Sequence, residues 1–135
     1  MLERVAEGIW TTAREQRFWG VETGTRMTIV RLGAAGAGLL VHCPVALDPA
    51  TQAEVDALGE VKAIVASSLY HHLYVGDWVR AYPEALVCGC PGLAKKRPDL
   101  PFAHVLGDEP HALWGDALRQ VFFSSRFEKE VVFFH

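Results

Sequence analysis

The sequence predicts an α/β fold in which helices flank a mixed sheet. From Leu39 to Cys90 the patterns alternate strand, helix, strand, helix and strand, which is the order of parallel βαβ units. Two apolar strand patterns fit an antiparallel hairpin at the start of this region, so the sheet is mixed. Because nearly all the strands are apolar, helices must cover the sheet.

The first half of the chain supplies the hairpin strands and the first helix. Val5–Thr12 alternates apolar and polar residues, as strands do, and Arg26–Leu32 is a second strand. The segment GLLVHCP, after the turn GAAGAG, is a third strand that is apolar throughout. The helix after it has Asp48 as its N-cap and Pro49 at its first position, and Gly59 follows its last turn.

The second half continues the alternation. Val61–Ala66 is an apolar strand, and GDWVRAYP is a short helix that Asp77 caps and Pro83 ends. The next strand lies in EALVCGCPG, and GLAKKRPDL is a short helix or turn ended by Pro98. Three more strands are expected, in PFAHVLGDE, ALRQVFFSS and KEVVFFH.

Length and composition indicate one domain, residues 1–135. Half of the residues are hydrophobic and 21% are charged, which excludes an intrinsically disordered chain. The net charge of −3 offers no excess of cations for phosphates, so we expect no nucleic-acid partner. We interpret the short basic cluster Ala94–Asp99 as a solvated helix end or turn.

Hydropathy and cysteine content bear on the cellular compartment. No apolar run reaches the roughly 18–20 residues that a membrane-spanning helix needs, so no membrane partner is expected. The N-terminal residues lack the apolar block of a signal peptide. A small, odd number of cysteines is typical of free thiols in a reducing compartment. The sequence therefore predicts a cytoplasmic protein with three free thiols, Cys43, Cys88 and Cys90.

Two adjacent histidines, His71 and His72, follow the predicted strand Val61–Ala66. Ligands bind at the carboxyl edge of open α/β sheets, so the pair is a candidate for a one-metal site. Adjacent side chains on a strand point to opposite faces, so both reach one metal only if the loop bends. The alternative is a polar loop in which His72 bonds the backbone and His71 faces water.

Four further residues are candidates for a site. Cys88 and Cys90 share one strand face, where they either give two thiolates to zinc or pack as small hydrophobic side chains. His42, at the end of a strand, is either a ligand or proton carrier or a core-edge histidine with a satisfied hydrogen bond. Arg26 either binds an anion or pairs with Glu22.

Several distinct blocks, taken in order, resemble a known family. The chain resembles an uncharacterised domain-of-unknown-function family, number 4336, which has a metallo-β-lactamase-like fold. The similarity runs from about Leu2 to His135. The blocks that carry it are RFWGVETGTRMTIVRL, LLVHCPVALDP, LYHHLYVGDW, CPGLAKKRPDL, LGDEP and EVVFFH.

Hydrolases of that fold have a His-x-His-x-Asp-His loop, and the resemblance places its last histidine at His72. Ser67, Leu69 and His71 then take the other two histidine positions and the aspartate position. Serine is a poor zinc ligand and leucine cannot be one. The resemblance thus implies a protein with the fold of hydrolases that use zinc or another divalent metal. Because its metal-binding motif is degraded, its expected hydrolase activity is weak or absent. The alternative is a non-catalytic binding or scaffold protein that keeps the fold without metal.

The resemblance also implies that this single domain is truncated, as the N-terminal half of a layered αββα sandwich. The final segment KEVVFFH would then form a strand at a sheet edge, with unpaired N–H and C=O groups and uncovered apolar side chains. We expect such an edge to recruit a second copy, which predicts a homo-oligomer.

Overall fold

The computed structural model of the protein describes residues 1–14, 17–18, 21–22, 25–34, 37–69, 72–124 and 129–135. Their elements, in chain order, are β1 (Glu3–Ala6), β2 (Ile9–Arg14), β3 (Arg17–Phe18), β4 (Val21–Glu22), β5 (Thr25–Arg31), β6 (Leu39–His42), α1 (Pro49–Leu58), β7 (Val61–Ala66), α2 (Val75–Ala81), β8 (Leu86–Gly89), α3 (Leu93–Lys96), β9 (His104–Val105), β10 (Arg119–Ser124) and β11 (Lys129–Phe134).

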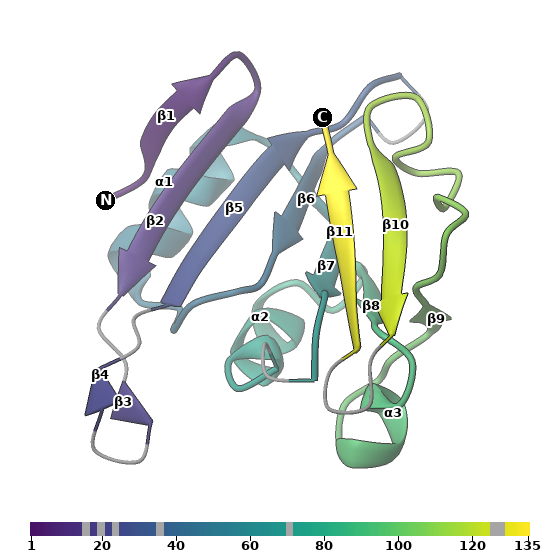
Figure 1. Ribbon diagram of the computed structural model, residues 1–135. Helices are drawn as coiled ribbons and strands as arrows, with labels where there is room; N and C mark the ends of the chain where they lie inside the picture. The colour runs from purple at the N-terminus through teal and green to yellow at the C-terminus, as the bar shows by residue number, and fades with distance from the viewer. Residues whose placement is uncertain (15–16, 19–20, 23–24, 35–36, 70–71, 125–128) are drawn as a thin grey trace.

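A mixed sheet forms the centre of the molecule, in the order β1-β2-β5-β6-β7-β8-β9 (Figure 1). Strands β1, β2, β5 and β6 pair antiparallel, whereas β6, β7, β8 and β9 pair parallel. Helices α1 and α2 lie on one face of this sheet, and the hairpin β10–β11 lies on the other (Figure 1). The predicted α/β fold with a mixed sheet is confirmed.

The prediction of one continuous strand over Val5–Thr12 is wrong. The structure divides this segment into β1 and β2, which pair with each other antiparallel. Gly8 lies in the turn between them with φ +73°, a left-handed conformation that glycine adopts at little cost. The predicted strand runs through Glu7 and Gly8, which form the turn between β1 and β2.

Helix α1 begins as the sequence predicts. The Asp48 side chain accepts a hydrogen bond from the Thr51 backbone N–H at 2.7 Å, with Pro49 at the first position of the helix. The start predicted for the next helix is wrong, because α2 begins at Val75 and Asp77 lies inside its first turn. There Asp77 pairs with Arg80 instead of capping the helix.

The core lies on both faces of the central strands. Leu39, Leu40 and Val41 of β6 are fully buried, as expected for a strand that is covered on both sides. Trp78 packs among the core side chains on the helical side, and its indole N–H donates to the Val45 carbonyl at 2.7 Å. None of the helices in the described part of the chain is long and apolar enough to span a membrane.

The β10–β11 hairpin covers the opposite face. All six residues of β11 pair with β10, so one edge of the C-terminal strand has its partner. On the other edge, the Val131 N–H donates to the Ser67 carbonyl at 2.8 Å, and Ser68 forms a bridge with Glu130. The start of β11 is thereby joined to the end of β7.

Candidate functional site

Several chemically active side chains meet at the carboxyl edge of the parallel strands. Strands β6, β7 and β8 all end there, and α3 and the start of β11 lie beside that edge (Figure 1). Ligands of open α/β sheets bind at this edge. The residues that follow the three strand ends are therefore the first place to look for a site.

Cys43 leaves β6 in an unusual conformation. Its φ is +54°, in the left-handed region that residues other than glycine rarely adopt. Its N–H donates to the Val65 carbonyl at 2.8 Å, and its Sγ lies 3.1 Å from the Ser67 Oγ. The Ser67 hydroxyl, at the first histidine position of the expected motif, is therefore buried against a thiol.

His72 is buried beside Arg97. The Arg97 Nη1 lies 2.9 Å from the His72 Nδ1 and 3.4 Å from the His72 carbonyl oxygen. A guanidinium has only donors, so the Nδ1 atom must accept this hydrogen bond. The proton of the neutral imidazole is then on Nε2.

Asp99 holds the guanidinium in place. The Arg97 Nε and Nη2 donate to the two carboxylate oxygens of Asp99 at 3.0 and 2.9 Å. The hydrogen bond to Asp99 raises the pKa of Arg97, and the same bond lowers the pKa of the Asp99 carboxyl. Arg97 is thus fully charged and oriented toward His72.

These contacts do not fit the metal that the fold implies. A zinc-bound histidine normally donates its second ring N–H to a carboxylate or carbonyl. In His72 one ring nitrogen accepts from Arg97 instead, and the other carries the proton. Among the residues that the structure describes, no three His, Cys, Asp or Glu side chains are grouped to hold a metal ion. His71, the second predicted ligand, lies outside those residues.

Cys88 and Cys90 are buried thiols. Burial raises the pKa of Cys88 to about 12. Burial also raises the pKa of Cys90, to about 11, although Lys129 and Lys96 act in the opposite direction. Both side chains are therefore protonated at neutral pH, and a protonated thiol is neither the nucleophile nor the metal-ligand form of cysteine.

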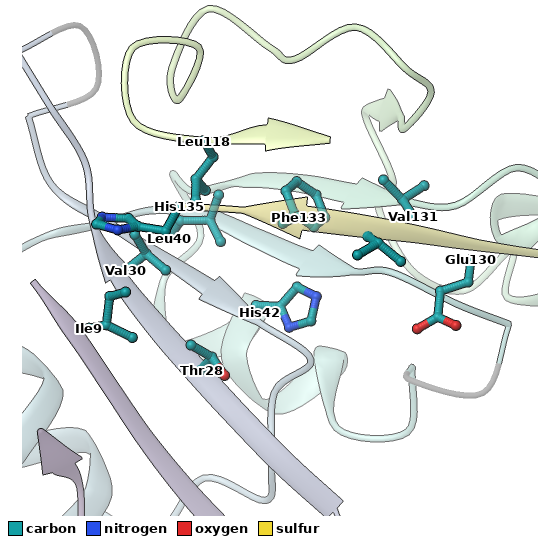
Figure 2. Close-up of a pocket in the computed structure, with 11 residues that line it drawn as sticks. Ile9, Thr28, Val30, Leu40, His42, Leu118, Glu130, Val131, Phe133 and His135 are labelled. Carbon is teal, nitrogen blue, oxygen red and sulfur yellow. The ribbon is translucent and has the colours of Figure 1, made fainter. Parts of the chain in front are cut away.

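His42 lies on the face of the sheet that the hairpin covers, in a cavity of about 260 Å³ between the central sheet and β11 (Figure 2). Burial lowers the pKa of His42 to about 4, while the nearby Glu130 carboxylate opposes this shift. His42 is thus neutral at pH 7. The cavity is lined by Ile9, Thr28, Val30, Leu40, His42, Leu118, Glu130, Val131, Val132, Phe133 and His135.

Arg26 contacts a neighbouring strand and not the residues around His72. It lies on β5, and its Nη1 contacts the Thr11 Oγ1 at 3.4 Å. Its predicted partner, the Glu22 side chain, falls outside the described side chains.

Sequence reasoning overlooked Arg97 as a member of the site. Its segment, Ala94–Asp99, follows the end of β8 and so comes to the same edge as the loop after β7. Its position directly after a parallel strand could have indicated that Arg97 lies near His72. The carboxyl ends of neighbouring parallel strands meet at one edge of the sheet.

Solved structures establish the fold. A metallo-β-lactamase from Pontibacter korlensis matches 99% of this chain with a TM-score of 0.71 at 14% identity. The metallo-β-lactamase FIM-1 from Pseudomonas aeruginosa, in its mono-zinc form, matches 99% with a TM-score of 0.66 at 12% identity. A putative diflavin flavoprotein A 5 from Nostoc sp. PCC 7120 matches 99% with a TM-score of 0.70 at 12% identity.

The chain spans 66, 63 and 61% of the length of these three structures, respectively. A comparison with curated proteins finds no match. A family model, described as a domain of unknown function (DUF4336), matches residues 6–132. This match covers nearly the whole chain, and the structural likeness agrees with the resemblance noted from sequence. The chain therefore belongs to the DUF4336 family, and its fold is that of the metallo-β-lactamases.

Proposed function

We propose that this protein is a metal-independent binding protein that keeps the metallo-β-lactamase fold without its catalytic metal. The hydrogen bond from Arg97 to the His72 Nδ1 carries this proposal. The Arg97 N–H occupies the Nδ1 lone pair that His72 would offer to a metal. The guanidinium also places a permanent positive charge beside the ring. Like charges at this distance repel, so Zn²⁺ is disfavoured next to the guanidinium.

The other motif positions support the same reading. Ser67 bonds the Cys43 thiol, and Leu69 offers no donor atom. A metal-bound hydroxide needs about three protein ligands to hold it in place. We therefore expect no hydrolysis of β-lactams or thioesters above background.

A zinc-dependent hydrolase is the second candidate. One observation favours it: similar structures are named metallo-β-lactamases, one of them in a mono-zinc form. The resemblance noted from sequence would place His72 at the last histidine of the motif. In that case Arg97 would have to leave His72 before a metal could bind.

The metal content of purified protein separates the two candidates. Protein prepared without chelator should contain well below one equivalent of zinc by elemental analysis. The Arg97→Met variant should bind zinc more tightly than the wild type in a chelator-competition titration, because it releases the Nδ1 lone pair. Arg80→Met is the matched control, since Arg80 pairs with Asp77 on α2 and should leave zinc affinity unchanged. Stoichiometric zinc that is lost in His72→Ala would overturn the proposal in favour of the hydrolase.

A further inference from the structure

Cationic side chains from two distant segments converge on the end of β7. The Lys96 Nζ donates to the Leu69 carbonyl at 2.8 Å, which anchors the last turn of α3 over the loop after β7. Arg97 continues from that turn to His72. The contact between Val131 and Ser67 brings the first residue of β11, Lys129, to the same place.

We call Lys95, Lys96, Arg97 and Lys129 the basic edge. Both Lys96 and Lys129 act electrostatically on the Cys90 thiol, so both lie near it. Among the described residues of these segments, the carboxylates are Asp99 and Glu130. Four cations against two carboxylates give these described residues a local charge of +2, in a chain whose net charge is −3. The charge of this edge is therefore opposite in sign to that of the whole chain.

The cations at this edge suit an anion. Lysine ammonium groups and an oriented guanidinium are the usual protein partners of phosphate oxygens. A small dianion gains from several cations at once, whereas a divalent cation is repelled by them.

We propose that the basic edge binds a phosphate group, with Lys96, Lys129 and Arg97 supplying the positive charge. The proposal rests on the proposed function, because a metal held by His72 would compete for the same place.

A phosphate titration tests the proposal on protein whose zinc content has been measured. Amide chemical shifts are followed by NMR at pH 7.5 as inorganic phosphate is added at constant ionic strength. The wild type should show saturable shifts that cluster at the ends of β7 and β8 and at α3. Acetate, with one charge, should bind more weakly than phosphate.

Charge-matched variants locate the site. Lys96→Gln with Lys129→Gln should weaken phosphate binding by about tenfold or more, because it removes two charge-assisted contacts. Arg4→Gln with Lys62→Gln removes the same charge from outside this edge, where Lys62 pairs with Glu60, and should change the affinity less than about twofold. Lys95→Gln with Lys96→Gln is a second variant, in case the first pair alters folding.

The outcomes separate the two proposals. Equal loss of binding in both charge-matched double variants, equal binding of acetate, or no saturable shift in zinc-free protein would overturn the phosphate site alone. Stoichiometric zinc in the purified protein would overturn the proposed function and the phosphate site with it.

Discussion

The imidazole of His42 packs edge to face against the phenyl ring of Phe133, with ring centroids 5.5 Å apart and planes at 78°. This contact joins the end of β6 to β11, across the space between the central sheet and the hairpin (Figure 2). It encloses an ionisable ring among apolar side chains. The histidine is therefore held in its neutral form, with a pKa of about 4.

The stability of the protein should depend on pH through His42. Its pKa falls from 6.5 to about 4 on folding, so between these values the unfolded chain binds a proton that the folded chain does not. Above pH 6.5 the contribution of the neutral His42 to stability is complete. As the pH falls from 6.5 toward 4, the free energy of unfolding decreases by about 3 kcal/mol at most. Urea unfolding between pH 7.5 and 4.5 measures the loss.

The His42→Phe variant should reduce this slope, because it keeps an aromatic ring at the position and removes the titration. The control is His135→Gln, at an exposed residue in the same cavity wall, which should keep the slope of the wild type. An unchanged slope in His42→Phe would mean that other groups cause the acid sensitivity.

Gly38 should tolerate no side chain. A Cβ at this position would lie 2.5 Å from the Glu60 carbonyl oxygen, which accepts the Leu39 N–H at the start of the β6–β7 pairing. Gly38→Ala should lower the free energy of unfolding by about 1–3 kcal/mol, because backbone must move to relieve the overlap. Gly107→Ala is the matched control, since its Cβ would meet no atom within 4 Å. Equal stability of the two variants in urea would contradict the prediction.

Gln120 should be needed for its hydrogen bonds and not only for its volume. Its Oε1 accepts the Trp114 indole N–H at 2.8 Å, and its Nε2 donates to the Gly107 carbonyl at 2.7 Å, all in the interior. Gln120→Leu should cost about 1–3 kcal/mol, because it leaves a buried N–H unsatisfied. Arg119→Leu, at the neighbouring exposed position, should change stability by less than about 0.5 kcal/mol. Thermal unfolding of both variants makes the comparison.

Self-association through β11 remains a prediction. β10 pairs with one edge of this strand, and the contacts to Ser67 and Ser68 occupy only the start of the other. Phe134 is 53% exposed near the far end of β11. We expect the wild type to associate at micromolar concentration, because a strand edge with apolar neighbours can pair with a second copy.

Replacing Val132 and Phe134 with lysine should shift the protein toward monomer in light scattering. Leu73→Lys is the control, since Leu73 is similarly exposed, at 52%, but lies outside any strand. A monomer that is indifferent to all three substitutions would show that the edge of β11 recruits no second copy.

Local patterns in the sequence determined the order of the elements. The cap at Asp48 and the apolar run from Val61 to Ala66 encode backbone conformation within a few residues, and both appear in the structure. The parallel pairing of β6, β7 and β8 followed from the strand–helix–strand order. The break at Gly8 did not follow, because it depends on the left-handed conformation of one glycine, which the strand pattern does not indicate.

The tertiary structure alone decided what the candidate residues contact. His72 meets Arg97 from 25 residues away, and His42 meets Phe133 from the last strand of the chain. No local pattern encodes such pairs, because they depend on which strand ends share an edge and which layer covers each face. The sequence by itself therefore determined the fold family. Only the packing decided that the Arg97 guanidinium bonds the His72 ring, where the expected motif would place a metal. A hydrogen-bond partner is set by distance in space and not by separation along the chain.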